Sequence, residues 1–302
     1  MILTHVLVEL CEHFVVRLAS CDVAALTPDQ LRHFTHLPAR ALYCQGVRQY
    51  VGETLAEAPR ARIQLCGRLV AEIDGRRIED GLPGRRGRLL FAYLVANRDR
   101  AIGRDELVEA VWPEGAPAAV DGDLRALLSK VRRAVGREAL GLKSRFRLEL
   151  PAEALIDVEA VAEAIHRAET GVAAQDWPRA WGASHLALVT TRREFLFGED
   201  APWISERRRH LENVEVRALE CYAAASLGVG ASELATAQRA ARRLIEKEPY
   251  RESGHRLLME ALSAQGNGAE AMRVYDNLRH LLREELGISP SPTTQDLHKR
   301  LL

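Results

Sequence analysis

The chain has 302 residues, 47% of them hydrophobic, and a formal net charge of zero. This length allows two or three domains, and this composition is that of an ordinary globular protein rather than a disordered chain. The five cysteines are odd in number, widely spaced and without a CxxC pair, which argues against a disulfide framework and indicates reduced cytoplasmic thiols. The apolar first residues lack a preceding Lys or Arg and are too few to span a bilayer. We therefore expect a cytoplasmic protein with no membrane contact.

Charge is distributed unevenly along the chain. Residues 61–150 carry 18 Lys and Arg against 13 Asp and Glu, a net charge of +5, whereas residues 1–60 carry −1 and residues 151–302 carry −4. A local basic excess is typical of a segment that meets an anionic partner such as nucleic acid. The middle segment is therefore the first place to look for a binding surface.

Residues 1–60 are predicted to form a short helical N-terminal extension of unknown role. Thr27-Pro28 provides an N-cap followed by proline at the first helical position, which is a typical helix start. The segment holds Cys11, His13, Cys21, His33, His36 and Cys44. Their irregular spacing does not suit a zinc site, so we expect no metal and no cofactor. A metal enzyme centred on this segment is the least supported alternative.

Residues 61–151 have the element order of a winged helix-turn-helix. Alternating apolar residues on both sides of Asp74-Gly75 predict a small antiparallel sheet over about 62–79. Helices are then expected up to residue 97, over about 104–111 and over 121–136. Alternation resumes between residues 141 and 151, which predicts a short β-hairpin that would form the wing.

The third of these helices has one apolar and one basic side. Its apolar residues are spaced four, three and four apart, which places them in a single stripe. They are Leu124, Leu128, Val131 and Val135. The opposite side carries Arg125, Ser129, Lys130 and Arg133, with Arg132 near the rim.

This helix suits a DNA groove, because an α-helix with its side chains fits the major groove, which is about 12 Å wide. Arg and Lys match the O6 and N7 atoms of guanine, and Ser can bond several base edges. The residues expected to face bases are Arg125, Ser129, Lys130 and Arg133. Those expected to reach phosphate or the adjacent minor groove are Arg132 and, on the hairpin, Arg145 and Arg147. A merely solvated helix is the alternative, which the preceding short helix and the following basic hairpin disfavour.

Residues 152–302 are predicted to contain only helices. The expected ranges are 157–173, 177–191, 203–227, 232–247, 251–265, 268–286 and 293–302. A faint similarity at a period of 34 residues is that of tetratricopeptide (TPR) repeats. The expected fold class is therefore mostly α with a small β component: a helical extension, a winged helix-turn-helix over 61–151 and an α-helical TPR-like solenoid over 152–302. Arg207–Arg209 are expected on a solvated helix face, and the tryptophans of this half between helices.

The motifs resemble a known family of regulators. "LRALLSKVRRAVG" resembles the recognition helix of the bacterial antibiotic regulatory protein (SARP) family, which carries an OmpR-type winged helix. "RGRLLFAYLVANRDRAIGRDELVEAVWP" is similar to the two preceding helices of that family. The pieces "EPYRE", "LMEAL" and "ELGISPSP" resemble the end of the bacterial transcriptional activator domain (BTAD). Together these regions cover roughly residues 62–302.

The resemblance implies a transcriptional activator. Such proteins bind direct repeats in double-stranded promoter DNA, often as two protomers side by side, and recruit RNA polymerase partly through the loop before the recognition helix. In this chain the loop residues would be Trp112, Glu114 and Ala116. The helical half would contact a ligand or another protein. One departure is Arg145-Phe146, which stands where OmpR-type wings carry Gly-Tyr.

Two further expectations complete the hypothesis. No recognisable Ser-His-Asp or Cys-His motif is present, so we expect no catalytic residues and no enzyme. The alternative function is a protein–protein adaptor built on the TPR-like half, in which the winged helix serves for docking. The zero net charge and the altered wing favour that alternative slightly.

Overall fold

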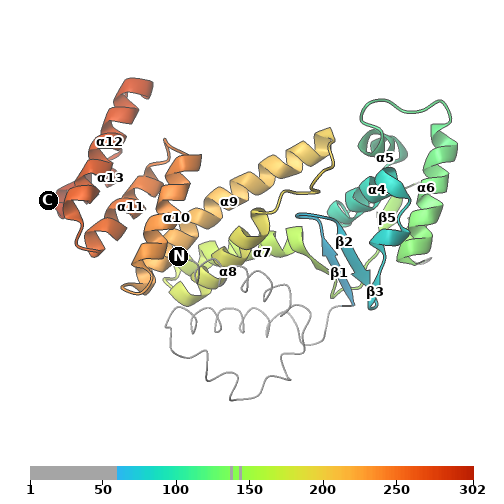
Figure 1. The fold of residues 1–302 in the computed structure, drawn as a ribbon, viewed down its shortest axis with the longest axis horizontal. Coiled ribbons are helices and arrows are strands. Elements are labelled where there is room, and N and C mark those ends of the chain that lie inside the picture. Colours follow the sequence, from blue (N-terminus) through green and yellow to red (C-terminus); the bar gives the residue numbers. More distant parts are fainter. Residues whose placement is uncertain (1–59, 137–138, 143–144) are drawn as a thin grey trace, which may run out of the picture.

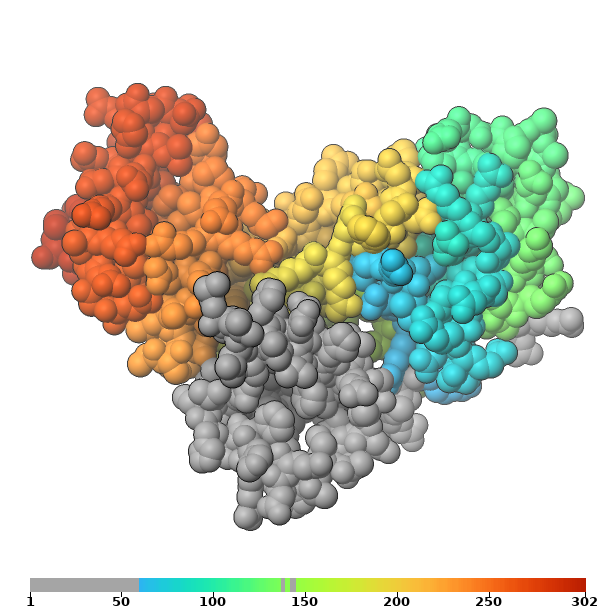
Figure 2. All heavy atoms as spheres, in the orientation of Figure 1, coloured from blue at the N-terminus to red at the C-terminus, as the bar shows by residue number. Residues whose placement is uncertain are grey.

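A computed structural model describes residues 60–136, 139–142 and 145–302 of the chain. The predicted helical extension, with its Cys and His residues, lies outside these residues apart from Arg60. A small sheet, three helices and a hairpin form one end of the described molecule, and a row of helices leads away from them (Figure 1). The space-filling view shows two masses bridged by the helices between them (Figure 2).

The sheet has four strands in the order β3-β2-β1-β6. They are β1 (Ala61–Gln64), β2 (Val70–Ile73), β3 (Arg76–Arg77) and β6 (Leu155–Ile156). The predicted hairpin between β2 and β3 is confirmed. Its turn residues Asp74 and Gly75 have φ of 48° and 73°, the paired left-handed conformation of a two-residue turn. The sequence did not predict β6, which runs parallel to β1.

Three helices and a hairpin follow the first three strands, in the predicted order. They are α4 (Gly84–Ala96), α5 (Arg104–Val111), α6 (Val120–Val135) and the hairpin of β4 (Leu140–Leu142) with β5 (Phe146–Leu148). α4 is the central helix and packs against α5, α6 and β5. Its apolar residues Leu90, Phe91 and Leu94 are fully buried. This helix therefore fixes the positions of the others.

The rest of the chain is helical, as predicted. The helices are α7 (Asp157–Ala173), α8 (Trp177–Thr191), α9 (Pro202–Val229), α10 (Leu234–Lys247), α11 (Glu252–Ala264), α12 (Gly268–Leu286) and α13 (Pro292–Leu301). Each from α7 to α12 packs against the next. Small residues allow close approach: a Cβ at Gly228 of α9 would lie 2.3 Å from the ring of Trp177 in α8. The predicted mostly-α class with a TPR-like helical half is confirmed.

One hydrophobic core runs from Ala61 in β1 to Leu244 in α10, so it includes both the sheet and the first helices of the helical half. A second cluster, which includes Leu258, Leu262 and Tyr275, lies among the later helices. Asp157, the first residue of α7, accepts hydrogen bonds from the backbone N–H groups of Leu65 (2.9 Å) and Cys66 (2.7 Å) after β1. β6 and α7 are thus attached to the sheet of the preceding segment. No helix within the described ranges is long and apolar enough to cross a membrane.

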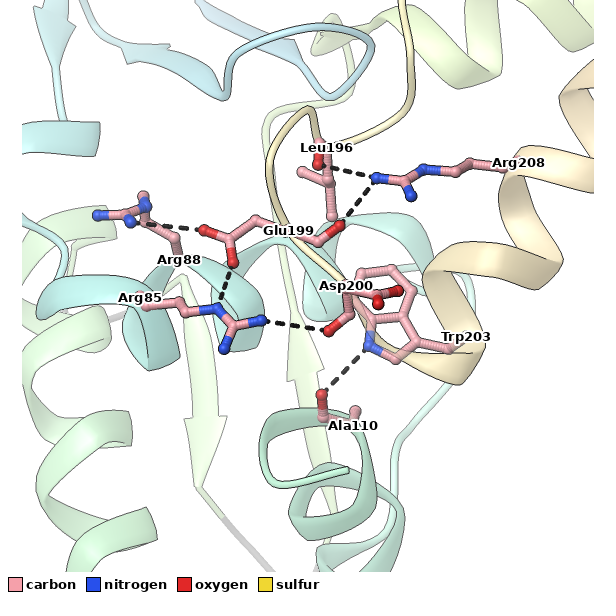
Figure 3. Close-up of polar contacts among 8 residues, drawn as sticks. All are labelled: Arg85, Arg88, Ala110, Leu196, Glu199, Asp200, Trp203 and Arg208. Atoms are coloured by element: carbon pink, nitrogen blue, oxygen red, sulfur yellow. Dashed lines mark hydrogen bonds and ion pairs between the residues drawn. The ribbon is translucent and has the colours of Figure 1, made fainter. Parts of the chain in front are cut away.

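The connection between α8 and α9, residues 192–201, lies at the junction where the sheet, α4 and the helical half meet. We call this connection the strap. Its backbone bonds to the β1–β2 connection: the N–H of Leu196 donates to Leu65 (2.7 Å), and that of Phe197 donates to Gly67 (2.9 Å). On the other side, the guanidinium of Arg85 in α4 donates to Glu199 (2.7 Å) and to the carbonyl of Asp200 (Figure 3). The strap therefore joins the sheet to α4.

Of the three arginines predicted on a solvated face of α9, Arg209 is exposed, but Arg207 and Arg208 bind backbone carbonyls. Arg208 donates to the strap carbonyls of Phe195, Leu196 and Glu199, the last at 2.8 Å. Arg207 donates to the carbonyl of Ala96 at the end of α4 (3.0 Å). The prediction of a solvated face is wrong for these two residues. Backbone carbonyls in a loop and at the end of a helix lack a backbone hydrogen-bond partner, and these side chains donate to them instead.

Candidate nucleic-acid interface

α6 is held in place by its apolar stripe. Leu124, Leu128, Val131 and Val135 are all buried, as the sequence predicts. They pack the helix against α4 and against the short 3₁₀ helix η2 (Glu79–Gly81). Because one side of α6 is fixed in this way, the opposite side must face away from the protein.

The outward side of α6 carries the predicted cations. Arg125, Ser129, Lys130 and Arg133 are all exposed. Arg125, Ser129 and Arg133 are four residues apart and so form one row along the helix, with Lys130 beside it. Arg132 is half-buried, on the flank next to the apolar stripe. The helix therefore presents a mixed Arg, Lys and Ser surface to solvent.

Charged residues at the two ends of α6 suit the helix dipole. Asp121 and Asp123 lie in its first turn, while Arg132 and Arg133 lie in its last turn. Arg104, the first residue of α5, donates to Asp121 with 2.8 Å between Nε and Oδ1. This bond raises the pKa of Arg104 and connects the starts of α5 and α6. It also places a positive charge beside Asp121.

The hairpin β4–β5 presents the other predicted cations. Arg145 and Arg147 are exposed, and Nε of Arg147 is 3.3 Å from the carbonyl oxygen of Arg98. Phe146, between them, is half-buried and packs against the core. Its backbone exchanges two hydrogen bonds with Ile102, at 2.8 and 2.9 Å. The hairpin is therefore fixed at its turn end, where Phe146 pairs with Leu142, and the Phe146 ring is used for packing.

The connection between α5 and α6 is partly exposed. Glu114 and Ala116 lie at the surface, whereas Trp112 is 5% exposed. The guanidinium carbon of Arg86 in α4 lies 5.5 Å from the centre of the Trp112 ring, a cation–π distance. Of the three residues predicted to contact polymerase, Glu114 and Ala116 thus have accessible side chains, whereas Trp112 is buried beneath the loop.

A polar network that the sequence did not reveal ties α4 to α5. The hydroxyl of Tyr93 donates to Glu106 (2.6 Å), and Arg100 binds the same carboxylate. The bond from Arg100 is the main reason why the pKa of Glu106 falls to about 2. Burial, and then the bond to Glu106, raises the pKa of Tyr93 to about 12. These residues lie in different elements and follow no helix or strand periodicity, so the sequence pattern could not predict that they would bind one another.

The tryptophans of the helical half lie between elements, as predicted. Trp203 of α9 donates through its indole N–H to the carbonyl of Ala110 in α5 (3.2 Å) and makes edge contacts with the rings of Tyr93 and Phe195. Within the described part of the chain, no group of three or more His, Cys, Asp and Glu residues is arranged to hold a metal ion.

Comparisons with known proteins agree with this architecture. Residues 156–302 match the family described as bacterial transcriptional activator domain. The regulatory protein AfsR of Streptomyces coelicolor is 30% identical over 247 residues, which are 82% of this chain and 24% of AfsR. Because that stretch is longer than residues 156–302, the similarity also covers part of the chain before residue 156.

EmbR, a transcriptional regulatory protein of Mycobacterium tuberculosis, is 28% identical over 259 residues, covering 79% of this chain and 62% of EmbR. A solved structure of EmbR from the same organism, in complex with a low affinity phosphopeptide, superposes with a TM-score of 0.66 and 25% identity over 80% of this chain and 65% of that chain. This chain spans about a quarter of AfsR and less than two thirds of EmbR. It carries a bacterial transcriptional activator domain in residues 156–302 and is related to the SARP-family regulators.

Proposed function

We propose that this chain is a transcriptional regulator that binds specific promoter DNA through α6 and the hairpin β4–β5. The observation that carries the proposal is the orientation of α6: a buried stripe fixes one side, and the basic row faces outward. The relatives AfsR and EmbR are named as regulators, which supports the role in transcription. In this proposal residues 61–151 read DNA, and residues 152–302 make the other contacts.

The chemistry divides between bases and phosphates. Arg125 and Lys130 can donate to guanine in the major groove, and Ser129 and Arg133 extend this row toward neighbouring base pairs. Arg132 on the flank and the hairpin residues Arg145 and Arg147 suit phosphate, which positions the domain without reading sequence. Such contacts displace counterions, so the binding constant should fall as salt rises.

Activation would use other surfaces. Glu114 and Ala116 are accessible beside the start of α6, where a loop can touch polymerase bound at the neighbouring promoter site. Two protomers on adjacent DNA repeats would form the functional dimer. The TPR-like helices would receive a ligand or protein partner, as solenoids commonly do on their extended surfaces.

The test begins with selection of a DNA site from random duplexes by the purified full chain. Binding of that site and of a random duplex is then measured for Arg125→Ala and Lys130→Ala, with Arg279→Ala as a matched exposed cation on α12. Each α6 variant should lose about 1–3 kcal/mol on the selected site and relax specificity at one base position. Arg279→Ala should bind as the unchanged chain does. Equal losses for all three variants on both DNAs would overturn the proposal.

The second candidate function is the adaptor, in which the basic domain docks on a protein. The observation that favours it is Phe146, which leaves the wing without the tyrosine hydroxyl of OmpR-type proteins. The DNA selection distinguishes the two functions. An adaptor would yield no enriched DNA sequence in the selection, and its affinity for random duplex would equal its affinity for any selected pool.

A further inference from the structure

The junction between the sheet, α4 and the strap contains an open hollow of about 320 Å³. It is lined by Arg68 and Leu69 from the β1–β2 connection, Arg88 and Leu89 from α4, and Leu196, Phe197, Gly198 and Glu199 from the strap. Three segments far apart in the sequence thus meet around one space. This volume is at the lower end of the range for small-molecule sites, which occur preferentially between domains.

Part of the lining of the hollow is cationic. Arg68 is exposed, and the side chain of Arg88 is 43% exposed. Arg88 reaches Glu199 at 3.4 Å, which is long for a charged hydrogen bond, whereas Arg85 holds the same carboxylate at 2.7 Å (Figure 3). The Arg88 side chain can therefore leave Glu199 and bind a ligand, because Glu199 keeps its shorter hydrogen bond to Arg85. Glu199 is 13% exposed and already neutralised, so it does little to repel an anion.

Another part of the lining is apolar. Leu69 and Leu89 line it, and Phe197 of the strap stands at its edge, 61% exposed. Leu196 has φ of 48° and Gly198 has φ of 80°, so the strap takes a left-handed conformation on both sides of Phe197. A left-handed non-glycine residue costs free energy, and such strain concentrates at binding sites. This backbone buries Leu196 and leaves Phe197 outside, where it can cover a ligand.

We propose that the hollow binds a small anionic amphiphile: an organic carboxylate or phosphate monoester with an apolar body. Arg68 and Arg88 would take the anion, since guanidinium groups form paired hydrogen bonds with both kinds of oxyanion. Leu69, Leu89 and Phe197 would take the apolar part. The site is separate from the basic side of α6, and its occupation requires no DNA. A bound molecule would bridge α4 and the strap, and so would stabilise the junction.

The test is calorimetric titration of the full chain, without DNA, with four probes. Phenyl phosphate and benzoate carry both features, inorganic phosphate carries the charge alone, and benzyl alcohol carries the ring alone. Phenyl phosphate or benzoate should bind with one-to-one stoichiometry, about tenfold or more tightly than either partial probe. The stronger of the two identifies the oxyanion. No saturable binding of either complete probe would overturn the proposal.

Variants assign the binding to this hollow. The double change Arg68→Gln and Arg88→Gln should weaken the complete probe about tenfold or more, while Arg86→Gln, an exposed neighbour on α4 outside the hollow, should leave it unchanged. Phe197→Ala replaces an exposed residue, so it should leave the fold intact. It tests the site if the double variant does not fold. It should reduce the affinity for phenyl phosphate toward that for inorganic phosphate. Unchanged affinity in Phe197→Ala, or in a folded double variant, would place the binding elsewhere.

Discussion

Asp157 makes the contact at the junction whose loss can be estimated most directly. Its carboxylate accepts from the N–H groups of Leu65 and Cys66, which are both fully buried, and from that of Val158 in its own helix. Asp157→Ala would remove the acceptor from the first two N–H groups, which belong to buried residues. An unsatisfied buried donor costs about 1–3 kcal/mol, so the free energy of unfolding should fall by about 2–6 kcal/mol.

Urea unfolding followed by circular dichroism measures this change, and hydrogen exchange locates it. Exchange of the Leu65 and Cys66 amides should accelerate together, because both lose one acceptor. Asp176→Ala is the matched control: this aspartate caps α8 at the surface, with 3.3 Å to the N–H of Arg179, and its loss should cost about 1 kcal/mol. If Asp157→Ala costs no more than the control and the two amides stay protected, the reasoning is refuted.

Arg100 lowers the pKa of Glu106 to about 2. The ionised Glu106 carboxylate therefore stabilises the fold at pH values above the ordinary pKa of glutamate, and this stabilisation is lost as pH falls toward 2. Glu106→Gln should therefore lower the midpoint of thermal unfolding at pH 7 but hardly at pH 2, and equal effects at both pH values would contradict this. Tyr93, with its pKa raised to about 12, should ionise later than ordinary tyrosines in an ultraviolet titration, and the late component should disappear in Tyr93→Phe; its persistence would contradict the assignment. Gly228→Ala places a methyl group against the Trp177 ring and should destabilise the helical half by about 1–3 kcal/mol, an effect that Trp177→Leu should reduce; additive losses in the double variant would count against this contact.

Local sequence patterns predicted most of the helices, because each helix buries one face and ends at a recognisable residue. α8 is the clearest example: Asp176 caps it, proline follows in its first turn, and it ends at Thr191 as expected. The exposed side of α6 followed from the same period, since four buried residues in one stripe fix where the other side chains point. The exposed side of α6 was therefore predictable from residues 121–136, whereas its interpretation as a DNA surface also needed the preceding short helix and the following basic hairpin.

Contacts between distant segments were not predictable. β6 has two residues, too few for any alternation to show, and it pairs with β1 more than 90 positions earlier. The roles of Arg207 and Arg208 depend on backbone carbonyls that the ends of other elements leave without partners. A run of arginines gives no sign of such acceptors. The hollow beside Phe197 likewise exists because three separate segments converge.

α9 is one uninterrupted helix of 28 residues, about 42 Å long at a rise of about 1.5 Å per residue. Near its start Trp203 bonds to α5, and farther along it packs against α10 and α11. A rigid tilt of this helix by about 5° would displace one end relative to the other by about 4 Å over this length. In the proposed function, a partner that reorients α10 and α11 would therefore shift α5 and the adjoining α6 without any unfolding.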